Sequence, residues 1–173
     1  MKLAIIGAGN VGRALASSAV RAGHDVILAS RDPDDAAAAA VDIGVRASAT
    51  NLAATEQSDI VILAVPTDAR TAVVSELGDT LRGKIVIDVS NRPTPDATGG
   101  TGPTSAAEEL QALLPHASVV KDLVASMGFR SVDAGPLLFA RTLEGMGWLN
   151  IALNMAGGTW QESWKLLGPD SIG

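Results

Sequence analysis

A glycine pattern near the start of the chain has the spacing of a turn that binds a dinucleotide. In this G-x-G-x-x-G pattern, Gly7 allows a tight turn and Gly9 lets the backbone approach a pyrophosphate, while Gly12 and the following Ala16 let the next helix pack close to the strand. Free N–H groups and the dipole at the helix N-terminus would favour the anion. The predicted contact residues are Gly7, Ala8, Gly9, Asn10, Val11 and Gly12. The alternative is a tight turn that holds no ligand.

The segments beside this pattern have the order that such a site needs. Residues 2–6 are an apolar, β-branched run typical of a buried strand, and residues 11–22 are expected to form a helix. Four apolar side chains fall on one face of that helix: Val11, Leu15, Ala19 and Ala22. Strand, glycine turn and helix thus follow one another as in a dinucleotide fold.

The turn after the second predicted strand, residues 25–29, would contact the adenosine ribose. NAD-binding proteins usually carry Asp or Glu there, but this strand continues into Ser30 and Arg31. Arginine offers a planar fork of donors, which suits the 2′-phosphate of NADP. A charge-assisted contact of about 1.5–3 kcal/mol would favour NADP about ten- to hundredfold. Two alternatives stay open: Asp32 takes the ribose, or Arg31 and Asp32 are solvated loop charges.

Strands and helices continue to alternate along the chain. Further strands are predicted at residues 45–47, 59–65, 84–89 and 118–121, and helices at 33–42, directly after Thr50 or Asn51, at 67–81 and at 105–114. This predicts an α/β fold with a doubly wound parallel sheet, a Rossmann domain over residues 1–121. Ligands lie beyond the carboxyl ends of such strands, which adds Val65, Pro66 and Asn91 to the candidate site. Strand termination by proline explains Val65 and Pro66 equally well.

The composition excludes several kinds of site. The chain has 173 residues and no cysteine, so disulfides, zinc–thiolate sites and thiol nucleophiles are excluded. His24 and His116 stand apart, and no metal site is expected. A net charge of −6 argues against nucleic acid and anionic membranes as partners. The apolar stretch 146–158 is too short and too polar to span a bilayer, so we expect a soluble cytoplasmic protein.

Residues 122–173 are expected to form a small helical appendage. Residues 137–167 are predicted to be mostly helical and are apolar nearly all round from 143 to 155. Trp160 and Trp164 lie one turn apart on a face that we interpret as packing. About 50 residues are too few for a separate core, so this segment must pack on the Rossmann domain or on another subunit. A helix that is apolar on all sides favours the second, so we expect a homodimer through the C-terminal helix.

The chain resembles the NADP oxidoreductases that depend on the deazaflavin coenzyme F420. Matching stretches follow the family order over most of the chain: KLAIIGAGNVGRALA, GHDVILASRDP, DIVILAVP, VIDVSN, TSAAEELQALLP, VVK and MGFRSVDAGPLLFARTLE. The resemblance implies NADP binding at Gly7–Gly12, Ser30 and Arg31. It departs from the family where Arg92 separates Asn91 from Pro93, and where a segment after Lys121 that helps form the deazaflavin pocket is missing.

These features predict an oxidoreductase that transfers hydride between NADP(H) and a deazaflavin or flavin-like small-molecule acceptor. Hydride transfer between stacked rings needs little acid–base help, and no catalytic residue is assigned. Lys121 and Glu144 are possible auxiliaries, although salt-bridged structural roles fit them better. Two alternatives are a non-catalytic NADP-binding module and an NADPH reductase of a small carbonyl or imine at a dimer interface.

Overall fold

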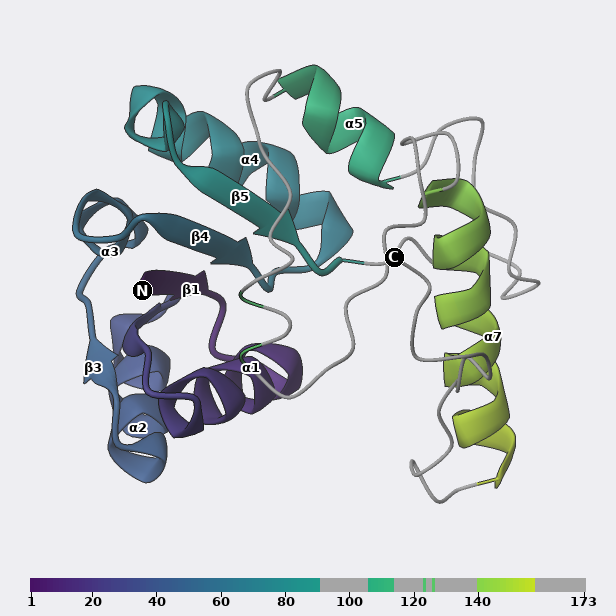
Figure 1. The fold of residues 1–173 in the computed structure, drawn as a ribbon, viewed down its shortest axis with the longest axis horizontal. Coiled ribbons are helices and arrows are strands. Elements are labelled where there is room, and N and C mark those ends of the chain that lie inside the picture. Colours follow the sequence, from purple (N-terminus) through teal and green to yellow (C-terminus); the bar gives the residue numbers. More distant parts are fainter. Residues whose placement is uncertain (91–105, 114–122, 124–125, 127–139, 158–173) are drawn as a thin grey trace. The chain divides into compact units, whose positions relative to one another are not determined.

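A five-stranded parallel sheet forms the centre of the chain (Figure 1). The computed structural model describes residues 1–90, 106–113, 123, 126 and 140–157. The strands are β1 (Lys2–Ile6), β2 (Asp25–Ala29), β3 (Arg46–Ala47), β4 (Ile60–Leu63) and β5 (Ile85–Asp88). They lie in the order β3-β2-β1-β4-β5, and every neighbouring pair is parallel. The strand order reverses between β1 and β4, so the predicted doubly wound α/β fold is confirmed.

Helices cover both faces of this sheet (Figure 1). The helices with residues in the two core layers are α1 (Asn10–Arg21), α2 (Pro33–Ile43), α3 (Asn51–Glu56), α4 (Thr67–Leu77), the 3-10 helix η1 (Gly78–Leu81) and α5 (Ala106–Leu113). The remaining helix, α7 (Ala140–Gly157), belongs to a second compact unit. Alternate residues of β1 point to opposite faces, as in any strand. Leu3 and Ile5 pack with α1 and α2, whereas Ala4 and Ile6 pack with α3 and α4. The almost continuous apolar strands therefore supply two hydrophobic layers.

Helix α1 packs on the sheet through small residues. Its buried residues are Gly12, Ala16 and Ala19, and Val11 is 55% exposed. The predicted close packing of Gly12 and Ala16 on the strand is therefore confirmed, and of the apolar residues predicted to share a face, Ala19 is buried and Val11 is not. Small residues at these positions let the helix backbone approach the strands closely, and the larger apolar side chain of Val11 turns away.

Two predicted elements end earlier than expected. Strand β4 covers four residues of the predicted run 59–65. The predicted helix 67–81 is divided at Gly78, whose φ of +48° ends α4, and the chain continues as η1. The predicted strand at 118–121 and both tryptophans, Trp160 and Trp164, lie outside the described residues. The predicted C-terminal helix is represented by α7.

The described chain forms two compact units. The first contains residues 1–90, 110–113, 123 and 126, and the second contains residues 106–109 and 140–157. Leu123 is buried in the core layer that α1 and α2 cover, so it belongs to the sheet unit. The domain boundary after Lys121 stays a prediction. Within the described residues, no helix has both the length and the apolar character needed to cross a membrane.

Candidate dinucleotide-binding site

The first glycine of the turn is required by the packing of the sheet. Gly7 has a φ of +119°, and its N–H donates to the carbonyl oxygen of Ala29 on β2 at 2.7 Å. A Cβ built on Gly7 would lie 2.2 Å from the carbonyl oxygen of Ala64, directly after β4. Because a backbone atom blocks that position, only glycine fits there.

The other two glycines differ sharply from each other. A Cβ on Gly12 would lie 1.9 Å from the carbonyl oxygen of Gly7, so the contact between α1 and β1 excludes any side chain. A Cβ on Gly9 would meet no atom of the described chain within 4 Å. Packing therefore explains Gly7 and Gly12 but not Gly9. The space beside Gly9 is where a pyrophosphate would approach the backbone.

The N-terminus of α1 has the properties of an anion site. Its N-cap is Gly9, which offers no side-chain acceptor, and the first turn contains no acidic residue. Asn10 and Val11, the first two residues of the helix, are exposed, and Ala8 is half-buried before them. The N–H groups at this end are satisfied neither by a cap nor by a carboxylate, which leaves them for a bound anion.

Arg13 supports this turn, and the sequence did not single it out. Its Nε donates to the carbonyl oxygen of Ala8 at 3.1 Å, and its Nη1 lies 3.3 Å from Oδ2 of Asp42 on α2. The arginine thereby holds the glycine turn and connects α1 to α2. Its place directly after the last glycine of the pattern was the available signal.

The two charged residues in the turn between β2 and α2 differ in their hydrogen bonds. Asp32 is the N-cap of α2, and its Oδ1 accepts a hydrogen bond from the N–H of Asp34 at 3.0 Å. The hydroxyl of Ser30 donates to the carbonyl oxygen of Asp32. Arg31 is exposed, and its side chain makes no hydrogen bond or ion pair with a residue that the structure describes. Asp32 is thus used for helix capping, and Arg31 remains available.

The corner after β4 also lies at the carboxyl edge of the sheet. Val65 is half-buried against the core layer on the α3 and α4 side, and the exposed Pro66 is the N-cap of α4. Asn91, the last of the predicted site residues, lies outside the described residues. The predicted positions from the glycine turn, from Ser30 and Arg31, and from Val65 and Pro66 all follow carboxyl ends of neighbouring strands.

A buried ion pair holds the corner after β5. Arg70 on α4 and Asp88 at the end of β5 have side chains that are 2% and 5% exposed, and Nη1 lies 2.9 Å from Oδ2. The second oxygen, Oδ1, accepts from the N–H of Ser90 at 2.8 Å. The sequence analysis missed this arrangement. Its signal was the spacing of Arg70, Val74 and Leu77, which places an arginine on the buried face of α4.

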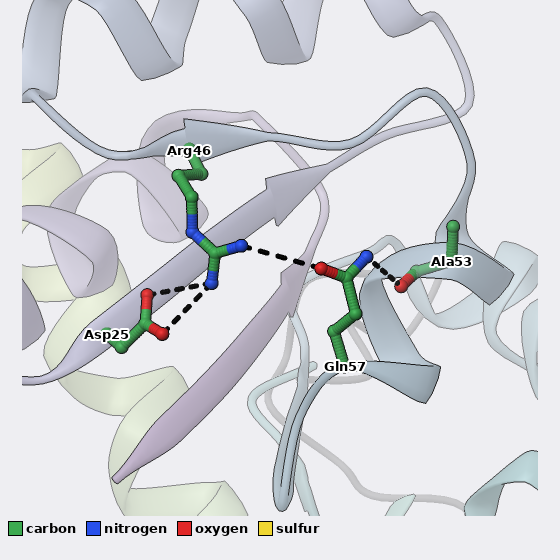
Figure 2. A network of polar contacts seen from close by, with 4 residues as sticks. All are labelled: Asp25, Arg46, Ala53 and Gln57. Carbon is green, nitrogen blue, oxygen red and sulfur yellow. Dashed lines mark hydrogen bonds and ion pairs between the residues drawn. The ribbon is translucent and has the colours of Figure 1, made fainter.

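The opposite edge of the sheet carries a different polar network (Figure 2). One nitrogen of Arg46, Nη2, donates to Oδ1 and Oδ2 of Asp25 at 2.8 and 3.0 Å. Its Nη1 donates to Gln57 Oε1 at 3.4 Å, and Gln57 Nε2 donates to the carbonyl oxygen of Ala53 at 2.9 Å. The side chains in this network pair with one another or with backbone.

No metal site is found within the part of the chain that the structure describes. His24 lies at the same edge as Asp25, and its Nε2 is 2.7 Å from the hydroxyl oxygen of Ser126. Lys121 and the side chain of Glu144 lie outside the described part. The described chemistry at the carboxyl edge is therefore a set of backbone donors with Arg31, without a histidine or a metal.

The family assignment follows from the sequence of this same region. Residues 2–92, which include every predicted site residue, match the family model described as NADP oxidoreductase, coenzyme F420-dependent. The chain belongs to this family. The match covers more than half of the 173 residues and contains the whole sheet. It confirms the resemblance inferred from the motifs.

Two relatives of known name share sequence with this member of the F420-dependent family. The chain is 34% identical over 111 residues to the F420-dependent NADP reductase of Methanothermobacter marburgensis, and the match covers 58% of this chain and 49% of the relative. The chain thus spans about half the length of that relative. It is also 32% identical over 147 residues to the Trk system potassium uptake protein TrkA of Mycobacterium tuberculosis, covering 78% of this chain and 67% of TrkA.

A solved structure shares the fold of this family member over nearly its whole length. It is the crystal structure of a protein assigned as an F420-dependent NADP reductase from Arthrobacter sp. FB24. The TM-score is 0.82 at 23% identity, and the alignment covers 97% of this chain and 100% of the other. At this identity, the likeness establishes the fold.

Proposed function

We propose that this chain binds NADP(H) and transfers hydride between it and coenzyme F420 or a flavin-like acceptor. The observation that carries the proposal is the difference among the three glycines. Gly7 and Gly12 have no room for a Cβ, whereas Gly9 faces open space beside an uncapped helix N-terminus. That geometry suits the approach of a pyrophosphate to the backbone.

The turn after β2 supports NADP over NAD. A carboxylate in this turn would accept hydrogen bonds from the ribose hydroxyls of NAD, but the Asp32 carboxylate accepts from the N–H of Asp34 in the cap of α2. Arg31 is exposed beside it and suits a 2′-phosphate. We assign Arg31 to the 2′-phosphate as a charge-assisted donor and Ser30 as a second donor. The expected preference for NADPH is about ten- to hundredfold.

Bound NADPH would supply the hydride, and the residues of this chain would hold the nicotinamide ring in place for the transfer. The glycine turn, Ser30 and Arg31 would hold the pyrophosphate and the adenosine half, so the nicotinamide half would extend toward the carboxyl ends of β4 and β5. Val65 and Pro66 offer an apolar surface there, and Asn91 follows β5. Alignment of two rings is the main requirement of such a transfer.

A fluorescence titration with NADPH and NADH, followed by addition of acceptors to the saturated protein, tests the proposal. We expect tighter binding of NADPH, and loss of NADPH absorbance when F420 or a flavin is added. Small carbonyls and imines form the next set of acceptors in the same assay. Equal affinity for NADH, or turnover with carbonyls or imines alone, would contradict the assigned chemistry.

A second candidate function is a binding module without catalysis. The likeness to TrkA favours it, because that relative is named for potassium uptake rather than for a reaction. The chain also matches only about half of the F420-dependent relative. Tight binding of NADPH with no turnover in the presence of every acceptor would select this function.

We also propose that the chain is a cytoplasmic homodimer joined through α7. Four apolar residues of this helix are 42–50% exposed: Leu143, Met146, Leu149 and Leu153. Their spacing places them along one side of the helix. Sedimentation equilibrium should give twice the chain mass. The double variant Leu149→Glu/Leu153→Glu should give the monomer mass, and a monomer for the unchanged chain would contradict the proposal.

A further inference from the structure

The buried pair Arg70–Asp88 stands at the side of the site where the nicotinamide half is expected. Strand β5 pairs with β4 so that Asp88 lies opposite Leu63, and the N–H of Val89 donates to the carbonyl oxygen of Leu63 at 3.2 Å. Ala64, the next residue of that strand end, contacts the glycine turn through its carbonyl oxygen. The corner after β5 is therefore connected to the pyrophosphate corner through one strand end.

Burial of this pair needs an explanation, because charged side chains are costly to remove from water. The side chains of Arg70 and Asp88 are 2% and 5% exposed. Apolar residues of similar size often stabilise such a position as well or better. The pair therefore gives weak support to stability, and a positional role explains it better.

The second carboxylate oxygen of Asp88 binds the backbone of Ser90. Oδ2 faces Arg70, and Oδ1 accepts from the backbone N–H of Ser90 at 2.8 Å. One carboxylate thus fixes the first residues of the loop after β5 relative to α4. The Ser90 hydroxyl oxygen is buried and makes no hydrogen bond with a residue that the structure describes. Buried hydroxyls normally have a hydrogen-bond partner, and a water, an ion or a bound group can complete one that has none.

We propose that Ser90 binds the nicotinamide half of the dinucleotide through its hydroxyl, and that Arg70 and Asp88 are its positioning residues. This inference rests on the proposed binding of NADP(H). The carboxamide group of nicotinamide offers both an acceptor and donors that a hydroxyl can meet. The residues after β1 and β2 would hold the pyrophosphate and the adenosine half, which leaves the corner after β5 for the nicotinamide half.

Two probes separate this proposal from the proposed function. NADPH contains the nicotinamide half, and 2′-phospho-ADP-ribose contains only the rest. If the unchanged protein binds neither, NADP binding itself is wrong. If it binds both, Ser90→Ala should weaken NADPH about five- to tenfold, as expected for one lost hydrogen bond, and should leave 2′-phospho-ADP-ribose unchanged. Equal affinity of Ser90→Ala and the unchanged protein for NADPH would overturn the assignment of Ser90.

The positioning role is tested by removing both charges together. The double variant Arg70→Met/Asp88→Val keeps apolar volume in the core and leaves no unpaired buried charge. It should show the same selective loss of NADPH affinity as Ser90→Ala, with no further loss when the two changes are combined. Additive losses, or an unchanged ratio between the probes, would show that the pair is only structural.

A matched control is available at the opposite edge of the sheet. Arg46 and Asp25 form an exposed ion pair, with side chains that are 53% and 48% exposed. Arg46→Met/Asp25→Val should leave the affinities for both probes unchanged. Thermal melting of every variant reports folding separately. If Arg70→Met/Asp88→Val does not fold, Arg70→Lys, which keeps a cation beside Asp88, should retain the ratio of the two affinities, and a Ser90→Ala-like loss in that variant would overturn the positioning role.

Discussion

The two edges of the sheet contain similar residue types but use them differently. At the amino edge, Arg46, Asp25 and Gln57 bond to one another and to backbone, and His24 meets Ser126 (Figure 2). At the carboxyl edge, the α1 N-terminus has no side-chain cap, and Arg31 makes no hydrogen bond or ion pair with a described residue. The side chains of the amino-edge network are thus paired within the protein, whereas these donors at the carboxyl edge have no described protein partner.

The difference supports the proposed binding edge. Backbone donors and charged groups are normally satisfied within a folded chain or by water. The uncapped N-terminus of α1 and the guanidinium of Arg31 lie where ligands of parallel sheets bind. Substitutions at the amino edge should leave ligand affinity unchanged. Substitutions at the carboxyl edge should lower it.

The largest effect is expected from Gly12→Ala. The new Cβ would lie 1.9 Å from the carbonyl oxygen of Gly7, and relieving that clash would require the backbone to move. Gly12→Ala should therefore lower the free energy of unfolding by about 3 kcal/mol or more. Gly9→Ala is the matched change, with no described atom within 4 Å. It should cost up to about 1 kcal/mol as a poorer N-cap, while NADPH affinity falls at least about tenfold. Urea unfolding and NADPH titration measure the two effects; an unchanged NADPH affinity in Gly9→Ala would contradict the site.

The next effect concerns the choice of coenzyme. Arg31→Gln should reduce NADPH affinity about ten- to hundredfold and leave NADH affinity unchanged, because only NADPH carries the 2′-phosphate. Binding titrations with both coenzymes measure it. A parallel loss for NADH would show that Arg31 acts elsewhere in the site.

Asp32 provides a stability change within the same turn. Asp32→Ala removes the acceptor for the N–H of Asp34 and should lower the free energy of unfolding by about 1 kcal/mol. The preference for NADPH should be retained in titrations with both coenzymes. A switch of preference in this variant would indicate that Asp32 contacts the ribose instead.

A smaller effect is expected at the amino edge. Arg46→Ala removes an ion pair whose side chains are about half exposed, which should change the free energy of unfolding by less than about 1 kcal/mol. NADPH binding should be unaffected. A loss of NADPH affinity would show that the amino edge also contributes to binding.

The smallest effect is a pH dependence at the same edge. Burial, followed by the positive charge of the N-terminus, lowers the pKa of His24 below its ordinary value of 6.5. The unfolded chain therefore takes up a proton first as the pH falls below 6.5, and stability declines until the folded-state pKa is reached. His24→Gln should remove this part of the pH dependence in urea unfolding. Identical pH profiles of the two proteins would contradict it.

The fold was largely predictable because the strands are apolar runs between glycine and proline signals. The glycine pattern and the residues after β2 were predictable for the same reason, since turn chemistry is local. The close packing of Gly12 and Ala16 on α1 was predictable too, whereas the exposure of Val11 was not, because close approach of the helix to the sheet favours small residues over the larger Val11. The Arg70–Asp88 pair was also missed, because its partners lie on separate elements and charged residues usually lie at the surface.

The most direct test maps binding on the protein itself. Backbone amide shifts of labelled protein, followed during a titration with 2′-phospho-ADP-ribose, report each edge of the sheet separately. The account predicts large shifts at Gly9, Asn10, Ser30 and Arg31, and unchanged positions for Asp25, Arg46 and Gln57. Shifts confined to the amino edge, or none at saturating ligand, would contradict the claim that the carboxyl edge holds the dinucleotide.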